Sequence, residues 1–472
     1  APSATDADAI STALFVLGPE EGSRWVRDRE QYSALFLEPV ADEDRLVVRI
    51  AGNTSAMRIP GDEHDTAGSA AAPSNAELAR RIDILSEDME DMRQEEAAPG
   101  PRQSRFGLGP AASAVYGAKR GVSLAGYGNV VFQGYASENQ TGAPVDKVNQ
   151  LDMLRVVTYV GYKVTDRILF NSEIEYEHAS TGKQGSVSVE FAYLDFLLRR
   201  EIGIRAGMVL VPVGWINEMH EPPTYLGALR PETERRIIPT TWRELGLGLF
   251  GAAGDFDWRV YAVTGLDGTG FDAGGLRGGR QKGSKALAED FAAVGRVDWV
   301  GAPGLVVGAS GYYGGSGQAA DDPLDPGNTI KAATLIVEGH LGYRARGLDI
   351  RGLFALSTVG DVASLNALNG FTGSESIGER LVGWYVQAGY DVLRGVQTRV
   401  QLLPYVRYES IDTQDRVPEG FSADLANDQQ IVTLGAQVLP IPNSAGKVDY
   451  TIRSNGADTG VNGLNVSLSY MF

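Results

Sequence analysis

Residues 213–242 concentrate charged side chains that could hold a small ion or an anionic solute. The stretch contains RPETERR, and an arginine and a glutamate follow it directly. Arginine presents planar donors that match phosphate and carboxylate groups, so these side chains could bind an anion. Because acids and bases are nearly balanced, they could equally pair with one another and fasten the stretch in place. The residues predicted to contact solute are Arg230, Arg235, Arg236, Glu232, Glu234 and Arg243.

A second cationic cluster lies in the polar gap at residues 267–289. Its members are Arg277, Arg280, Lys282 and Lys285. Three interpretations stay open: a cation-rich vestibule that attracts anions, a site for lipopolysaccharide phosphates, and a solvated loop.

The histidines give little support for catalysis or for a metal site. The chain has four histidines, and a hydrolase would need a serine beside one of them, as Ser180 stands near His178. No third residue that could orient such a pair is evident. HEPP at residues 220–223 is not the zinc motif H-E-x-x-H, because residue 224 is threonine. The acidic run at 321–325 could hold calcium, but a solvated turn is favoured, so we predict no enzyme activity, no cofactor and no metal.

Composition narrows the class of protein further. The 472 residues carry a formal charge of −18 and no cysteine. The acidic balance argues against a nucleic-acid binder, which needs a basic face, and the lack of cysteine excludes disulfides and thiolate metal sites. No stretch approaches the roughly 18 apolar residues of a membrane-spanning helix. A transmembrane β-barrel would look equally hydrophilic, because only one face of each strand is apolar.

The last nine residues, LNVSLSYMF, alternate strictly between the two faces of a strand. One face is apolar throughout, and the other carries an asparagine, two serines and a methionine. Chain ends usually fray, so this regularity indicates a strand that is paired on both edges. The apolar face is expected to meet lipid.

Connections between the predicted strands alternate in length from residue 122 to residue 472. Seven short turns alternate with eight longer polar gaps, which gives sixteen strands. Short turns on one rim, long loops on the other and an even number of strands are typical of outer-membrane barrels. Residues 121–472 are therefore predicted to form an all-β, 16-stranded antiparallel transmembrane β-barrel.

Each predicted strand is apolar on one side and charged on the other. In a closed barrel the charged side faces the lumen, and closure removes the exposed edges that a sandwich would leave. Opposite charges across a pore would orient dipolar solutes without making a phosphate-specific site. The predicted lumen wall includes Arg155, Glu173, Glu175, Arg205, Arg259, Arg296 and Arg399. Aromatic residues predicted for girdles at the membrane interface are Tyr193, Trp299, Tyr312, Tyr313, Trp384, Tyr385 and Tyr470.

Four segments precede the predicted barrel. Residues 1–56 contain strand-like pieces such as ALFVLG and could form a small β-module, 57–73 are a polar linker, 74–96 a helix, and 97–120 a second linker. The helix begins with a capping box at Ser74. Its apolar residues recur at intervals of 4, 3, 4 and 3, a heptad seam that favours self-association over a lone amphipathic helix. The seam is Leu78, Ile82, Leu85, Met89 and Met92.

Several stretches after residue 104 resemble bacterial outer-membrane porins related to the phosphate-selective porin O and P family. They include FGLGPAASAVYGAKRGVSLAGYG, ILFNSEIEYEHAS, VSVEFAYLDFLL, VPVGWINEMHEPPTYLGALRPETERRIIPTTWRELGLGLFG and LRGGRQKGSKALAED. The resemblance covers about three quarters of the chain. It implies a sixteen-stranded, trimeric diffusion channel with the loop after the fifth strand folded into the lumen. Phosphate specificity is not carried over, because no ladder of lysines and arginines is obvious.

The sequence therefore predicts a passive outer-membrane channel for small hydrophilic solutes or ions, with its N-terminal region in the periplasm. The start APSA would suit a mature chain after signal cleavage. Expected partners are outer-membrane lipids, lipopolysaccharide and two further copies of the chain. The terminal Phe472 is similar to the signal that the outer-membrane assembly machinery reads. The alternative is a barrel plugged by its own loop that tethers the envelope or displays the N-terminal module.

Overall fold

The computed structural model describes residues 21, 24–26, 33–39, 46–52, 104–118, 120–182 and 184–472. The chain divides into two units, Ala1–Glu90 and Asp91–Phe472. In the first unit, β1 (Ser33–Pro39) pairs antiparallel with β2 (Leu46–Gly52). The predicted heptad seam, with the helix at 74–96 that carries it, lies outside the described residues, as does the linker at 57–73.

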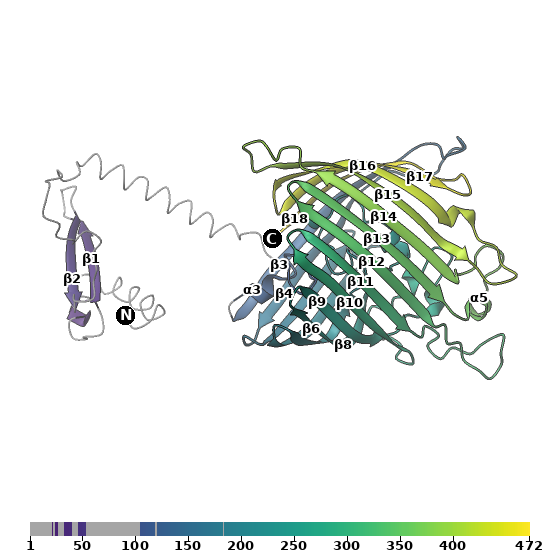
Figure 1. The fold of residues 1–472 in the computed structure, drawn as a ribbon, viewed down its shortest axis with the longest axis horizontal. Coiled ribbons are helices and arrows are strands. Elements are labelled where there is room, and N and C mark those ends of the chain that lie inside the picture. Colours follow the sequence, from purple (N-terminus) through teal and green to yellow (C-terminus); the bar gives the residue numbers. More distant parts are fainter. Residues whose placement is uncertain are drawn as a thin grey trace. The chain divides into compact units, whose positions relative to one another are not determined.

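The second unit is a closed antiparallel barrel (Figure 1), and its described residues contribute sixteen strands. Each strand pairs with its neighbours in the chain, and the last strand pairs with the first, with Val466 opposite Phe132. The predicted 16-stranded barrel is confirmed. The strands are β3 (Gly121–Tyr135), β4 (Gln150–Lys163), β5 (Ile168–Glu177), β6 (Val187–Arg199), β7 (Ile202–Leu210), β8 (Arg243–Ala253), β9 (Phe256–Thr264), β10 (Phe291–Ala302), β11 (Leu305–Gly314), β12 (Thr334–Ala345), β13 (Leu348–Val359), β14 (Arg380–Tyr390), β15 (Gln401–Arg416), β16 (Asp428–Ile441), β17 (Ser444–Asn455) and β18 (Gly463–Met471).

Short helices occupy the connections and the stretch before the barrel. They are α3 (Ala114–Gly117), α4 (Glu232–Arg236), α5 (Val362–Asn369) and the 3-10 helices η2 (Pro222–Thr224), η3 (Gly268–Gly270), η4 (Arg277–Gly279) and η5 (Leu425–Asn427). Among the described residues, no helix has both the length and the apolar character needed to cross a membrane.

The two faces of each strand meet different surroundings. On β12, Leu335, Val337 and Leu341 are 36 to 44 % exposed on the outside of the barrel. Glu338 and His340 on the same strand are each 4 % exposed and face inward. The two-residue period thus places apolar side chains outside and charged ones inside. The same holds for β18, where leucine, valine and tyrosine are exposed and Asn465, Ser467 and Ser469 are buried.

The connections define two rims. Short turns join β4 to β5, β6 to β7, and so on around one rim, and longer loops join the strands at the other. One of the predicted short turns is longer in the structure, because β14 ends at Tyr390 and β15 begins at Gln401. Arg399 therefore lies in this connection, exposed, and is not part of the lumen wall as predicted.

Two segments enter the lumen. Residues 211–242, between β7 and β8, are the longest connection of the barrel, and we call them the inner loop. Residues 104–118 were predicted to belong to a linker, but most of them are buried or half-buried inside the barrel; we call them the lumen segment. Leu108 and Val115 of this segment are at most 1 % exposed. Its glycines, prolines and alanines resemble a linker because small residues also suit a crowded interior.

The predicted aromatic girdle is only partly correct. Tyr313, Trp384 and Tyr470 are exposed on the outside. Tyr193, Tyr312 and Tyr385 are instead at most 2 % exposed and contact buried groups of the interior. Strand ends alone could not separate these two sets, because neighbouring positions such as Tyr312 and Tyr313 point to opposite faces.

Candidate functional site in the lumen

The two ends of the inner loop are tied together. The Asn217 side chain donates hydrogen bonds to the carbonyls of Val211 (2.6 Å) and Trp242 (2.8 Å). Its oxygen accepts the Trp242 N–H at 2.6 Å. One buried amide thus closes the loop where it leaves and re-enters the barrel wall.

The middle of the inner loop is fastened to the opposite side of the barrel. Lys447 on β17 donates to the carbonyls of Pro222, Tyr225 and Gly227 at 2.6 to 2.9 Å. A buried ammonium with three acceptors uses all of its donors. The loop is therefore held at the wall and cannot hang freely in the lumen.

A buried ionic cluster fastens the first part of the inner loop. Asp298 on β10 lies 3.1 Å from Arg259, 2.8 Å from Arg296 and 2.8 Å from His340. Arg296 also donates to the Gly214 carbonyl of the loop. Arg259 pairs with Glu218 of the loop at 3.1 Å. Two predicted wall arginines thus act as fasteners.

Other predicted wall residues also form pairs. The pairs are Arg155 with Glu175 (3.1 Å), Glu173 with His220 (2.9 Å) and Arg205 with Asp195 (2.8 Å). Arg243, predicted to contact solute, pairs with Glu190 at 2.8 Å instead. For Arg243 the structure favours mutual pairing, the alternative left open by the balanced charges of residues 213–242. The wall residues are paired in the same way.

Glu234 also fastens the loop and does not face a cavity. It accepts hydrogen bonds from the Tyr385 hydroxyl (2.7 Å) and the Ile216 N–H (2.6 Å). Burial raises its pKa, while these two hydrogen bonds lower it. Buried partners hold the side chains of Glu234 and Arg243, and neither residue lines the cavities described below, so their predicted contact with solute stays a prediction that this geometry does not favour.

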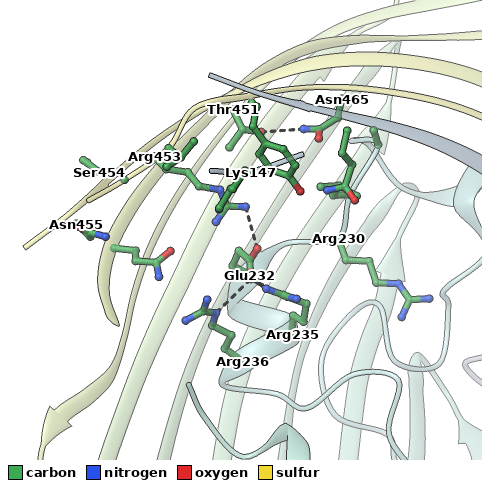
Figure 2. A pocket seen from close by; sticks show the side chains of 18 of the residues that line it. Lys147, Arg230, Glu232, Arg235, Arg236, Thr451, Arg453, Ser454, Asn455 and Asn465 are labelled. Atoms are coloured by element: carbon green, nitrogen blue, oxygen red, sulfur yellow. Dashed lines mark hydrogen bonds and ion pairs between the residues drawn. The ribbon is translucent and has the colours of Figure 1, made fainter. Parts of the chain in front are cut away.

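A cavity of about 560 Å³ opens on the long-loop side of the inner loop (Figure 2). We call it the cationic cavity, because its lining includes seven cationic side chains and one carboxylate, that of Glu232. Four of the six predicted solute contacts line it, namely Arg230, Glu232, Arg235 and Arg236. The other cationic residues are Lys147, Arg155, Arg277 and Arg453.

Glu232 organises part of this charge. Pro231 precedes α4, where a proline suits the start of a helix. The first turn of α4 is acidic and its last turn is basic, as the helix dipole favours. This places Arg235 (2.8 Å) and Arg236 (3.5 Å) beside Glu232, and Arg453 of β17 adds a contact at 2.9 Å. Burial alone would raise the pKa of Glu232, but the three arginines outweigh it and lower the pKa to about 2. Glu232 is therefore ionised at neutral pH, with more positive than negative charge around it.

Arg230 and Arg277 are not paired in this way. The Nε and Nη2 atoms of Arg230 and the Nη1 atom of Arg277 are buried and have no hydrogen-bond partner among the described residues. In Figure 2 the Arg230 side chain extends away from Glu232. Burial, followed by the nearby Arg280 and Arg230, lowers the pKa of Arg277 to about 9. Buried donors are normally satisfied, so these two guanidinium groups are suited to hold an anion or ordered water.

The second cationic cluster of the sequence divides between two roles. Arg277 lines the cavity, which agrees with the vestibule interpretation for that residue. Arg280 donates to the carbonyls of Arg277 and Thr241 and so joins this loop to the inner loop. Lys282 and Lys285 are exposed and do not line the cavity.

Lys147 and Arg453 were missed by sequence reasoning. Arg453 shares its strand face with Asp449 and Thr451, so strand parity could have placed it in the lumen. Lys147 lies in the first long loop, where no period applies and no signal was available.

A second cavity, of about 490 Å³, lies on the short-turn side. Its lining includes Pro110 of the lumen segment, Pro223 and Thr224 of the inner loop, and Arg344 and Asp349 of the wall. The two cavities share no lining residue. Since Tyr225 lines the cationic cavity, the inner loop separates the two spaces at residues 223–225.

Comparison with known proteins finds one relative by sequence and several solved structures by fold. No protein-family model matches the chain. In fold the chain is similar to Salmonella typhi OmpF in complex with daunomycin (13 % identity, TM-score 0.48, 74 % of this chain and 97 % of that one). It is also similar to the outer membrane channel DcaP of Acinetobacter baumannii (12 %, TM-score 0.48, 74 % and 97 %) and to an anion-selective porin from Comamonas acidovorans (13 %, TM-score 0.47, 74 % and 99 %).

A curated protein of Aquifex aeolicus (strain VF5), described as an uncharacterized protein, is 35 % identical over 393 residues. The alignment covers 81 % of this chain and 87 % of that protein. At this identity and coverage, the chain belongs to the same family as the Aquifex aeolicus protein.

Proposed function

We propose that this protein is a diffusion channel of the bacterial outer membrane through which small hydrophilic anions pass. The observation that carries the proposal is the cationic cavity inside a closed barrel whose outer face is apolar. A barrel that exposes leucine and valine on most of its strands needs an apolar solvent, and lipid supplies one.

The preference for anions follows from the charges that line the cavity. Seven cationic side chains face one carboxylate, and Arg230 and Arg277 have guanidinium nitrogens without partners. In a cavity with low-dielectric walls such charges raise the local concentration of anions. A relation to the phosphate-selective porin O and P family remains a prediction, and the cavity chemistry does not single out phosphate among anions.

The competing function is a structural barrel that its own chain closes. It is favoured by one observation, that the cationic cavity and the short-turn cavity share no lining residue. Inserting the purified protein into planar lipid bilayers separates the two functions. We expect discrete steps of current. In a salt gradient, the sign of the zero-current potential should show that anions pass more readily than cations. Absence of steps, with the protein shown to be inserted, would contradict the channel.

The outer face should reject charge. Val466 on β18 is 41 % exposed among other apolar side chains, so Val466→Arg should lower the free energy of unfolding by about 2–4 kcal/mol near the midplane of a bilayer. The matched variant is Asn465→Arg, since Asn465 lines the cationic cavity on the opposite face of the same strand. Urea titration in lipid vesicles measures both. Equal losses in the free energy of unfolding of the two variants would show that the even-numbered residues of β18 do not face lipid.

We further propose that the protein assembles as a homotrimer, with the predicted seam Leu78, Ile82, Leu85, Met89 and Met92 joining three helices in the periplasm. Native mass spectrometry in detergent should give a trimer for the full chain and a less stable assembly for a chain that begins at Arg105. A monomeric full-length protein would contradict the trimer. A fully stable trimer of the shortened chain would show that the helix is dispensable.

A further inference from the structure

The lumen segment occupies one half of the barrel at the short-turn end. Its contacts begin at β3, which α3 adjoins, and run through Gly161 and Lys163 on β4 to Arg259 on β9. Lys163 donates to the Ala118 carbonyl at 3.0 Å, and Asn171 on β5 donates to the Ala112 carbonyl at 2.9 Å. The short-turn cavity lies toward the other strands, β12 to β18, with Pro110 on its border. The segment therefore fills lumen that would otherwise continue this cavity.

Tyr116 is the main anchor of the segment. Its hydroxyl donates to Asp195 at 2.6 Å and accepts from Arg205 at 2.8 Å. Its ring meets Phe106 edge to face at 5.0 Å, and Phe106 meets Phe250 of β8 at 4.8 Å. The wall residues that receive Tyr116 and Phe106, namely Asp195, Arg205 and Phe250, form a specific binding site that we call the seat. It combines aromatic packing with a charged hydrogen bond.

The wall is shaped to receive the segment. A Cβ atom at Gly161 would lie 2.6 Å from the Cβ of Val115, so only glycine leaves room for that side chain. Within the segment, a Cβ at Gly109 would meet the carboxylate of Glu221 on the inner loop at 2.6 Å. One glycine of the wall and one of the segment thus let the segment pack closely against the wall and the inner loop.

The seat stays chemically satisfied without its occupant. Arg205 and Asp195 hold each other through two hydrogen bonds of 2.8 and 2.9 Å. Asn171 also lies 3.2 Å from the Tyr193 hydroxyl. On the wall, removing Tyr116 and Ala112 would leave no isolated buried charge, which is the costly outcome. The group that loses its partners is the Glu221 carboxyl of the inner loop. The wall is therefore compatible with an occupied and a vacated state.

The segment is also linked to the inner loop. The Glu221 carboxylate accepts the N–H groups of Ala111 (3.1 Å) and Ala112 (2.8 Å). Burial raises the pKa of this carboxyl to about 7, although the two N–H groups lower it. Glu221 immediately precedes η2, and residues 223–225 of the loop separate the two cavities. Withdrawal of the segment would take away both partners of Glu221 at this barrier.

We infer that the lumen segment is a removable plug that closes half of the short-turn end and holds the inner loop, so that its withdrawal opens the channel. This inference rests on the proposed channel function. The segment precedes β3 directly and continues upstream into residues 1–103 of the chain. A pull on that upstream chain would therefore act on Phe106 and Tyr116 through the backbone.

The test exchanges side chains between the plug and its seat in the full-length protein. Gly161→Val forces Val115 away, and the double variant Gly161→Val with Val115→Gly returns the same two side chains in exchanged positions. We expect single-channel conductance to rise on the order of twofold in Gly161→Val, since pore width governs conduction, and to return toward the native value in the double variant.

Gly446→Val is the matched control. Gly446 lies opposite Leu468, on the outer face, and a Cβ there meets nothing within 4 Å, so its conductance should equal that of the native protein. Tyr116→Ala, which removes the anchor without adding volume, should raise conductance as well and serves if Gly161→Val does not assemble. Native conductance in both Gly161→Val and Tyr116→Ala would overturn the plug and leave the channel standing. Absence of current in every form, native included, would overturn the channel and the plug together.

Discussion

Replacing Arg230 and Arg277 with glutamine is expected to shift the zero-current potential of the channel toward cation preference. Both side chains line the cationic cavity, and both carry buried guanidinium nitrogens without a protein partner. Their charge is therefore available to a passing anion. A unit charge 4 Å away contributes about 1 kcal/mol even in a water-like dielectric. Losing two such charges, about 2 kcal/mol together, should lower the ratio of anion to cation permeability on the order of thirtyfold, since 1.4 kcal/mol corresponds to a factor of ten.

The measurement is the zero-current potential across a bilayer that separates two concentrations of potassium chloride. Lys282→Gln with Lys285→Gln is the matched control, because it removes two charges from the same loop at exposed positions outside the cavity. Exposed charges are screened within about 8 Å at physiological salt. Equal shifts for the two pairs would show that net charge, and not the cavity, sets the preference. No shift for Arg230 and Arg277 would show that neither guanidinium meets the permeating ion.

Arg235 and Arg236 are expected to behave differently, although the sequence grouped them with Arg230. Both lie beside Glu232 on α4. Removing them would take away cationic charge and also leave Glu232 with only Arg453 as a partner. The less compensated Glu232 carboxylate would then attract cations itself, so the change in selectivity would have two causes. The structure therefore makes Arg230 and Arg277 the cleaner test of anion binding.

The barrel could be predicted from the sequence because its signals are local. A two-residue period marks each strand, and the alternation of short and long gaps counts the strands and identifies the inner loop. These signals do not depend on which residues meet across the lumen. The one misplaced wall residue, Arg399, lies just before β15, where the period extends beyond the paired strand.

The interior could be predicted only in part, because it depends on contacts between distant residues. Balanced charges in the inner loop gave no way to tell that Glu234 would meet Tyr385, which is 151 positions away. No local pattern in the sequence indicates that Gly161 packs against Val115 either. The lumen segment resembled a linker, since its small residues suit both an exposed turn and a tight interior. In each case tertiary packing decided between alternatives that the sequence left equal.

The buried ionic cluster at Asp298 should dominate the stability of the interior. Asp298→Asn keeps the shape of the side chain but removes the charge that Arg259, Arg296 and His340 share at 2.8 to 3.1 Å. Breaking a buried ion pair by neutralising one partner typically costs 3–5 kcal/mol, because the other charges stay buried without compensation. Glu218 and Glu338 remain nearby and compensate in part. We therefore expect a loss of about 3 kcal/mol in the free energy of unfolding.

Asp257→Asn is the matched control for this variant. Asp257 lies directly opposite Asp298 in the register of β9 and β10, and it forms no ion pair within the described part of the chain. Because Asp257 faces the like charge of Asp298 across the two strands, its replacement relieves repulsion and should not lower the free energy of unfolding. Denaturant titration of both variants in the same lipid vesicles gives the comparison. Because Arg296 also donates to Gly214 of the inner loop, Asp298→Asn should increase current noise in single-channel records as well. Equal stability of the two variants would show that the cluster is hydrated and that the loop is held mainly by Lys447 and Glu234.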